Sequence, residues 1–470
     1  MTSTSTKRKP TFFEALLPLN FIALFLGIGY GIFRLNAEIL LIAAAFVSGL
    51  IALRLGYTWR ELEEGIVVSI SKAMPAMLIV ICVGLLIGSW IACGTIPMLV
   101  YYGLKTISPK LFLVTACFVC SVISALTGTS WGTVGTMGVA FMGIAQGMGI
   151  PLAQAAGAIV AGSYFGDKIS PFSDTTNLAP IAAKSNLFDH IKHMLWTTTP
   201  AWIIGLVVYY FLGRSFDSGI LKSDQMDLIS NTIQTHFHFH WLLLLPPIGI
   251  LYFAIRKKPT IPGMLIVTLL ATILALIFQD ITLKQVATAI TIGYESRTGV
   301  ESVDNLFSRG GMAGMMHVTL IAFCAFSFAG IVQKAGMLDV ILDRLLKVAR
   351  STGALIAAVV SSCIAVALMT GSSFLSILIP GELFAPAFRA RGLAAKNLSR
   401  TTEDSGTVVV PLIPWSMAGV FMAGTLDVPT TAYAPWAIMC YLGLIFALIY
   451  GFTGFAIAPK IRDDETIAGS

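Results

Sequence analysis

Residues 111–166 contain no Asp, Glu, Lys, Arg or His. Directly after this uncharged run, two carboxylates, one ammonium group, four hydroxyls and one amide occur within residues 167–177. In a soluble protein this would be an ordinary polar loop. In a membrane protein, polar backbone and charge at depth persist only where they serve a buried cavity. The first question is therefore whether the chain belongs in a bilayer.

The composition agrees with a membrane protein. Hydrophobic residues make up 56% of the 470 residues and charged residues 11%, with a mean hydropathy of +0.84, whereas soluble domains have roughly 25% charged residues. A membrane-spanning helix needs about 20 apolar residues, so the chain is long enough for about ten to twelve spans. We expect an all-α polytopic membrane protein that forms one integral domain over residues 1–470.

The N-terminal sequence and the cysteines exclude several other classes. Lys7, Arg8 and Lys9 precede an apolar run, residues 12–33, that is too long for a signal peptide and is expected to be the first span. These basic residues place the N-terminus in the cytoplasm. No basic stripe accompanies the net charge of +6, so nucleic-acid binding is not expected. The seven cysteines lie in apolar segments without metal-ligand spacing, which indicates small buried side chains.

Two uncharged runs are interrupted by glycine and clustered hydroxyls, at Thr127–Thr133 and at Thr370–Ser373. Such residues lower helix propensity and offer the backbone other hydrogen-bond partners, so a broken helix is expected at each position. The surrounding segments form two weakly similar halves, at about residues 73–212 and 312–457. The Lys and Arg distribution favours inversion of one half relative to the other. Two inverted repeats with discontinuous or re-entrant helices are typical of secondary transporters.

Charged residues also indicate where the chain meets the membrane surface. Residues 61–72 are amphipathic and are expected to lie at the interface, ahead of a separate span over residues 73–93. Lys184, His190 and Lys192 are expected to mark another surface, ahead of the span that follows them.

The stretch from Asp167 to Asn177 holds the strongest candidate for an ion site. A carboxyl group in a dry, apolar setting favours its neutral form, so it is suited to exchange a proton for a cation such as Na+. Asp174 is the principal candidate. For Asp167 and Lys168, a simple ion pair in a turn at the membrane surface is an equally open interpretation. The neutral oxygen donors that suit a hard cation are the side chains of Ser170, Ser173, Thr175, Thr176 and Asn177.

Residues 128–132 match the G-x-S-x-G pattern of serine hydrolases. That nucleophile needs a strand before it and a helix after it, whereas both flanks here are apolar helices, so an enzyme is not expected. Instead, unwound carbonyls and the hydroxyls of Thr129, Ser130 and Thr133 are expected to face the site. Close packing of small residues between helices is the alternative interpretation.

The second half offers a corresponding set of polar residues. Ser372 and Ser373 occupy the second break, and Glu403 and Asp404 form a second candidate acidic site. For these two carboxylates, a helix-end cap at the membrane interface is an equally open interpretation. Together, the two halves predict a two-part site in which the broken helices line a cavity near the middle of the membrane.

The stretch Gly166–Ala179, together with Thr127–Thr133, resembles the NhaC family of bacterial Na+/H+ antiporters. The resemblance covers nearly the whole chain, in length, in the layout of spans and in the second break. It implies electrochemically driven exchange of cytoplasmic Na+ for external H+ in the bacterial inner membrane. Relatives in the same family exchange malate for lactate with cation coupling, and others carry amino acids. An organic anion needs a positive group at the site, for which Lys168 and Arg400 are available.

These arguments give one set of expectations. Asp174 is the principal Na+/H+ carboxylate with Asp167 or Asp404 as its partner, and Na+ binds at Asp174, Asp404 and Thr129. Na+ and H+ are transported and no cofactor is needed. A cation-coupled antiporter of malate and lactate, or of amino acids, is the alternative. The expected partners are the lipid bilayer and small ions or a small organic anion, without nucleic acid, and a homodimer stays open.

Overall fold

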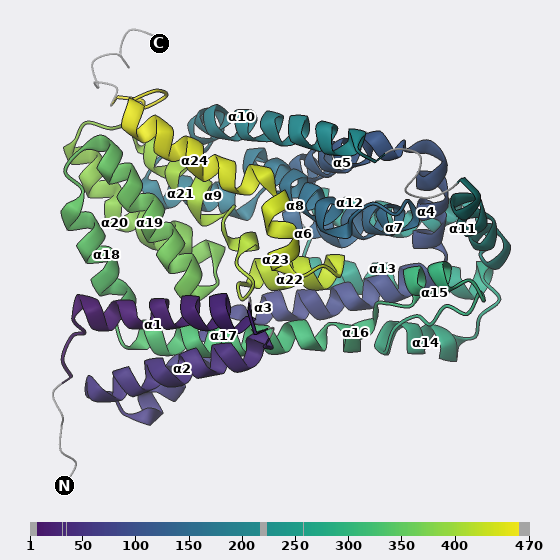
Figure 1. The fold of residues 1–470 in the computed structure, drawn as a ribbon, viewed down its shortest axis with the longest axis horizontal. Coiled ribbons are helices and arrows are strands. Elements are labelled where there is room, and N and C mark those ends of the chain that lie inside the picture. The colour runs from purple at the N-terminus through teal and green to yellow at the C-terminus, as the bar shows by residue number, and fades with distance from the viewer. Residues whose placement is uncertain (1–6, 31, 34, 217–222, 257, 460–470) are drawn as a thin grey trace.

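The computed structural model describes residues 7–459 apart from residues 31, 34, 217–222 and 257 (Figure 1). The N-terminal residues 1–6, which the charge pattern assigns to the cytoplasm, lie outside the described residues. Within the described part, the chain is helical and its β structure is one bridge between Leu393 and Pro459. The helices up to residue 214 are α1 (Phe12–Leu24), α2 (Ala37–Arg54), α3 (Trp59–Ala92), α4 (Thr95–Thr106), α5 (Phe112–Thr127), α6 (Ser130–Thr133), α7 (Val139–Gly147), α8 (Leu152–Ile169), α9 (Asp174–Ala183) and α10 (Leu187–Arg214).

The remaining helices continue the same pattern of long apolar segments joined by short ones. They are α11 (Ser223–His236), α12 (Leu245–Ile255), α13 (Thr260–Phe278), α14 (Leu283–Thr291), α15 (Glu301–Phe307), α16 (Gly311–Gly314), α17 (Met316–Lys334), α18 (Met337–Val348), α19 (Thr352–Thr370), α20 (Ser373–Ala390), α21 (Ala395–Gly406), α22 (Met417–Leu426), α23 (Thr430–Tyr433) and α24 (Ile438–Thr453).

Seven helices in the described residues are long and apolar enough to cross a membrane, and up to ten segments qualify if each bent helix pair is one span. One such pair joins α21 to α22 with a bend of 47°, and another joins α23 to α24 with a bend of 59°. The expected all-α polytopic membrane protein with broken helices is therefore confirmed. The number of spans reaches only the lower end of the expected range.

Helix α3 differs from the expectation. Residues 59–92 form one continuous helix, not an interfacial segment followed by a separate span. It begins with a reciprocal cap, in which Thr58 accepts a hydrogen bond from the Glu61 backbone and the Glu61 side chain bonds back to Thr58. At 1.5 Å per residue the helix is about 50 Å long, well beyond the roughly 30 Å of a hydrocarbon core. The helix is therefore longer than a membrane span requires.

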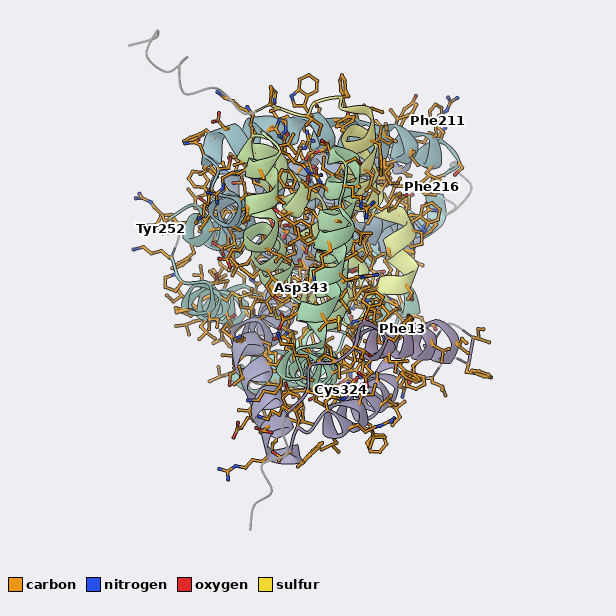
Figure 2. All side chains as sticks on the ribbon, turned by 90° about the vertical axis from the view of Figure 1, so that its left-hand side faces the viewer. Phe13, Phe211, Phe216, Tyr252, Cys324 and Asp343 are labelled. Atoms are coloured by element: carbon orange, nitrogen blue, oxygen red, sulfur yellow. The ribbon has the colours of Figure 1, made fainter. Side chains whose placement is uncertain are left out.

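Helices α1, α2, α3 and α17 lie together along one long side of the molecule, and α10 runs along the opposite side (Figure 1). Large apolar side chains cover much of the outer surface. Phe211 and Tyr252 lie near the rim of the view in Figure 2, and Phe13 lies within its outline; they are 60%, 53% and 79% exposed. Exposed apolar area of this extent suits contact with lipid rather than water. All seven cysteines, by contrast, are buried inside the protein as free thiols.

Helices α5 and α8 pack closely because α8 carries glycines at the contact. A Cβ atom on Gly162 would lie 2.1 Å from a carbonyl oxygen of α5, and one on Gly166 would lie 2.2 Å from another. Any larger residue at these positions would push the helices apart. The close contact brings the end of α8, with Asp167 and Lys168, beside the end of α5.

Both expected helix breaks are present. Gly128 follows α5 with a φ of +71°, and Gly371 follows α19 with a φ of +63°. Glycine adopts this left-handed conformation without the steric cost that a Cβ would add. The hydroxyls of Thr129 and Ser372 then accept hydrogen bonds from the backbone three residues on and so start the next helix. The two halves thus share one order of elements: a helix, a glycine break and a capped helix.

Candidate ion-binding site

Each glycine break is held against an irregular segment of its own half. A Cβ atom on Gly128 would lie 2.6 Å from the backbone of Phe172, between α8 and α9. Ser170 Oγ in the same segment donates a hydrogen bond to a carbonyl oxygen of α5 at 2.7 Å. In the second half, the backbone N–H of Met417 donates to the Gly371 carbonyl oxygen at 3.0 Å. Two polar segments therefore meet two helix breaks inside the protein.

Asp167 lies in the last turn of α8 and is buried. Its Oδ2 atom accepts a hydrogen bond from Ser130 Oγ at 2.8 Å. Since Ser130 is the first residue of α6, this hydrogen bond joins the first break to the end of α8. Asp167 does not pair with its neighbour Lys168, so the interpretation as a simple surface ion pair is wrong.

Lys168 instead forms an ion pair with Asp404 of α21. The Nζ and Oδ1 atoms are 2.5 Å apart, and neither side chain is exposed. Thr197 of α10 also donates to Asp404 Oδ1, at 3.0 Å. A fully buried ion pair needs good geometry and additional hydrogen bonds to offset the loss of water. The pair connects α8 of the first half of the chain to α21 of the second half inside the protein.

Glu403, the neighbour of Asp404 on α21, is also fully buried, but neither of its carboxylate oxygens has a hydrogen-bond partner. The hydroxyls of Thr175 and Thr407 lie beside it, and the charges of both Lys168 and Asp167 act on it, although the Lys168 ammonium group is paired with Asp404. The Thr407 hydroxyl is itself without a partner. An ionised carboxylate in such a place is strongly unfavourable, so it must take up a proton or a cation. Burial of this kind also excludes a helix cap at the membrane interface.

The other polar residues of the 167–177 stretch mostly stabilise its conformation. Asn177 Nδ2 donates to two backbone carbonyls of the stretch, at 2.9 and 2.7 Å. Thr176 Oγ1 donates to the Asp167 carbonyl oxygen at 3.1 Å. Ser173 caps α9, and its hydroxyl lies 3.2 Å from that of Thr175. Thr175 therefore connects this stabilising network to Glu403.

Most of the hydroxyls predicted at the two breaks also bond to the backbone rather than to a carboxylate. Thr129 and Ser372 cap helices, and Thr133 Oγ1 donates to the Thr129 carbonyl oxygen at 2.9 Å. The Ser373 carbonyl oxygen accepts a hydrogen bond from within α20 at 3.0 Å. Ser130, as described above, donates to a carboxylate. The hydroxyls of Thr129, Thr133 and Ser372 thus bond to the backbone, whereas that of Ser130 bonds to a carboxylate of the candidate site.

Asp174 occupies a different environment from the three buried carboxylates. It is the first residue of α9, and its side chain is exposed. Its charge acts on Asp167, but it is not enclosed with Glu403 and Asp404. Its assignment as the principal carboxylate stays a prediction.

Sequence reasoning missed the contribution of α10. His190 is fully buried rather than at a surface, and its Nδ1 atom lies 2.9 Å from Ser399 Oγ. His193 is 7% exposed, and its Nε2 atom lies 3.0 Å from Asn397 Oδ1. The signal was present in the sequence: His190, His193 and Thr197 are spaced to share one face of a helix. The lysines around them made the segment look like a surface.

Arg400 of α21 is fully buried as well. Its Nη1 atom donates to the Ala456 carbonyl oxygen at 2.8 Å, and the Tyr450 ring lies 5.8 Å from the guanidinium carbon. Its Nε and Nη2 atoms have no hydrogen-bond partner. These two atoms form the edge that binds a carboxylate in a bidentate manner.

Known proteins that resemble this chain decide its family. A family model described as the Na+/H+ antiporter family matches residues 162–455. An uncharacterized Na+/H+ antiporter of Haemophilus influenzae is 46% identical over 464 residues, covering 97% of this chain and 99% of that protein. The chain belongs to the Na+/H+ antiporter family.

Two further relatives illustrate the range of this family. The Na+/H+ antiporter NhaC of Alkalihalophilus pseudofirmus is 39% identical over 422 residues, covering 90% of each chain. The malate-2H+/Na+-lactate antiporter of Bacillus subtilis is 34% identical over 449 residues, covering 95% of this chain and 96% of that protein. The resemblance to NhaC is therefore confirmed. As a Na+/H+ antiporter family member, the chain is a multi-pass membrane transporter and not an enzyme, and the family implies Na+ and H+ as transported ions.

Proposed function

We propose that this protein exchanges cytoplasmic Na+ for external H+ across the bacterial inner membrane, and that Glu403 and Asp167 bind the two ions in turn. The observation that carries the proposal is the Glu403 carboxylate, which is fully buried without a hydrogen-bond partner. A carboxylate in this environment is stable when protonated or when paired with a cation. Alternate occupancy by H+ and Na+ is the elementary step of an antiporter.

The surrounding oxygen atoms suit Na+. The hydroxyls of Thr175 and Thr407 lie beside Glu403, and Asp167 adds a second carboxylate that is held by Ser130. Hard monovalent and divalent cations prefer carboxylate, hydroxyl and carbonyl oxygens over nitrogen or sulfur. Na+ binding between these groups would displace the proton, because both ions compete for the same negative charge.

Lys168 and Asp404 have a different role in this proposal. Their ion pair keeps both charges in place at the centre of the protein, so Asp404 is already neutralised when Glu403 is vacant. Na+ would have to displace the Lys168 ammonium group before it binds to Asp404. Asp174, which is exposed, attracts Na+ toward the site by its charge.

The balance of buried charge favours a cation as the cargo. The buried side chains include three carboxylates, Asp167, Glu403 and Asp404, and two cations, Lys168 and Arg400. The fully ionised cluster therefore has one excess negative charge, which one Na+ or one proton neutralises. An organic anion would increase the buried negative charge, which is unfavourable in a medium of low dielectric constant.

A specific observation favours a second candidate, a cation-coupled exchanger of malate and lactate or of amino acids. The unpartnered Nε and Nη2 atoms of Arg400 have the geometry of a carboxylate clamp. In this alternative, the organic carboxylate binds to Arg400 while Na+ or H+ binds to Glu403. The family relative from Bacillus subtilis described above is named for such an exchange.

Transport by purified protein in proteoliposomes tests the proposal. Uptake of labelled Na+ and of labelled malate would be measured at two pH values, each with and without an opposing pH gradient. We expect Na+ uptake that depends on the pH gradient and does not require malate. Malate uptake that depends on Na+, without Na+/H+ exchange in its absence, would replace the proposal with the alternative.

A further inference from the structure

Helix α21 is buried along nearly its whole length although most of its side chains are polar. Every residue from Asn397 to Gly406 is buried, and the sequence of this segment contains one apolar side chain, Leu398. Helices that only pack against other helices in a membrane are apolar, because each buried polar group without a good partner is costly. Polar residues in such a place indicate a path for an ion.

Polar contacts between α21 and α10 recur along the face of α21 toward α10. At one end, Asn397 exchanges two hydrogen bonds with the backbone of Ala458, at 2.6 and 2.9 Å, and contacts His193 at 3.0 Å. Further in, Ser399 contacts His190 at 2.9 Å. We define the α10–α21 seam as these side chains together with those at its inner end, Thr197, Lys168 and Asp404.

Several buried polar atoms of this region have no hydrogen-bond partner. They are His190 Nε2, Thr198 Oγ1, Arg400 Nε and Nη2, and Asp404 Oδ2. Native structures leave few such atoms, and a group of them in one region indicates a function beyond packing. Among these atoms, His190 Nε2 belongs to a ring that can accept a proton at one nitrogen and release one from the other.

We propose that the α10–α21 seam conducts protons between the ion site and the cytoplasmic face, and that Na+ reaches the site by another way. This inference rests on the proposed exchange of Na+ for H+. The outer end of the seam lies near Lys184, Lys192 and Lys396, and basic residues of this kind mark the cytoplasmic side.

The charges along the seam exclude Na+ and still permit a proton relay. The positive charges of Arg400 and Lys396 act on the His193 ring, and that of Lys168 acts on the His190 ring. They repel any further cation, including Na+, and the seam contains no carboxylate outside Asp404. A neutral imidazole needs no lasting charge to relay a proton, because one ring nitrogen accepts while the other donates.

The proton balance of the relay is simple. When Na+ binds at the site, the carboxyl group of Glu403 loses its proton. His190 Nε2 accepts a proton from the site, and Nδ1 releases one to the Ser399 hydroxyl, 2.9 Å away, which passes its own proton toward His193. His193, which is 7% exposed, repeats the transfer toward the surface. Each ring ends neutral, as it began, and one proton leaves for each proton displaced.

The test separates the rate of proton release from its amount. Detergent-solubilised full-length protein is mixed rapidly with Na+ in weak buffer, and a pH indicator follows the released protons. In His190→Gln and His193→Gln, we expect the same number of protons and the same Na+ affinity, but release slowed about tenfold or more, since well-placed proton carriers contribute at least that much. The matched control is His236→Gln, whose ring lies on α11, away from the seam.

A merely structural role of the histidines would change the Na+ affinity or the folded yield and not the rate alone. His193, which is partly accessible, offers a second variant if replacement of the fully buried His190 prevents folding. Equal rates in the wild type and the seam variants would overturn the inference, as would a loss of released protons, because the histidines would then hold the exchanged proton themselves. A wild-type protein that releases no protons on Na+ addition would instead refute the proposed function.

Discussion

The polar stretch at the end of α8 and the polar helix α21 meet inside the protein, but they differ in how their side chains are satisfied. In the first, Asn177, Thr176 and Asp167 all have hydrogen-bond partners. In the second, Glu403 and the bidentate edge of Arg400 have none. The first stretch therefore builds a defined local structure, whereas the second retains unused capacity to bind ions.

The stretch at residues 167–177 holds most of the residues by which the family is recognised, whereas α21 holds the carboxylate that is expected to bind the transported ions. The first stretch is easy to recognise because its conformation needs particular residues at particular positions. The sequence marks Glu403 as a candidate but does not show that it is buried, since an acidic residue in a polar segment also suits a surface. Variants in the first stretch should therefore mainly lower stability, whereas variants of Glu403 should mainly lower transport.

The largest effect on transport is expected from Glu403→Gln. The amide has nearly the same shape but neither binds a proton in its place nor balances Na+, so exchange should fall below detection while folding is retained. Na+-dependent proton movement in everted vesicles measures this loss. The matched control is Glu301→Gln, an exposed carboxylate on α15, which should leave exchange unchanged. Retained exchange in the Glu403 variant would move the ion site elsewhere.

The largest effect on stability is expected from Lys168→Met. This variant leaves Asp404 buried without its cation, which costs about 3–5 kcal/mol when one partner of such a pair is removed. Unfolding in detergent, followed by tryptophan fluorescence, would show a strongly lowered midpoint. Combining the change with Asp404→Asn should recover part of the loss, because no unpaired charge then remains. An unchanged midpoint would mean that the ion pair contributes little.

A smaller effect distinguishes the two helix breaks. Gly128→Ala forces a residue with a Cβ into the left-handed conformation, which costs about 1–2 kcal/mol of stability. The new Cβ would also lie 2.6 Å from the Phe172 backbone, so the neighbouring segment would have to shift. At Gly371 the nearest atom is 3.3 Å away, and at Gly299, which has a φ of +79°, nothing lies within 4 Å. The loss of stability should thus decrease in the order Gly128, Gly371, Gly299. Equal losses would show that the backbone conformation alone matters.

The smallest effect is expected from Asp174→Asn. Because this side chain is exposed, its charge contributes less than about 1 kcal/mol to Na+ binding at the site, equivalent to a rise in KM of about fivefold or less. The maximal rate should stay close to that of the wild type. Na+ uptake at a series of Na+ concentrations measures both quantities. Complete loss of exchange would restore the assignment of Asp174 that the sequence suggested.

Much of the fold was predictable from the sequence. The uncharged runs predicted membrane helices, and the Gly and hydroxyl clusters predicted breaks that the structure has at Gly128 and Gly371. The boundary between interface and span in α3 was not predictable, because an amphipathic helix and its apolar continuation share one periodicity. No local residue pattern marks the point at which a continuous helix leaves the bilayer.

The candidate site was predictable only in part. The sequence singled out Asp167, Lys168, Glu403 and Asp404, all of which the structure buries close together. It did not indicate that Lys168 pairs with a residue 236 positions away, since such a contact depends on how the halves pack. The exposure of Asp174 and the burial of His190 depend on the same packing. The local sequence pattern thus identified the polar residues, whereas the tertiary structure determines which of them are buried and which pair with each other.

The seven buried thiols have a practical consequence for experiments on this protein. Since none of them is accessible from the aqueous phase, a membrane-impermeant maleimide should leave the wild-type chain unlabelled. A single cysteine introduced by mutation then reports by itself whether its position is reached from the inside or the outside of a vesicle. The natural sequence therefore already provides a silent background for mapping aqueous pathways, without a cysteine-free version.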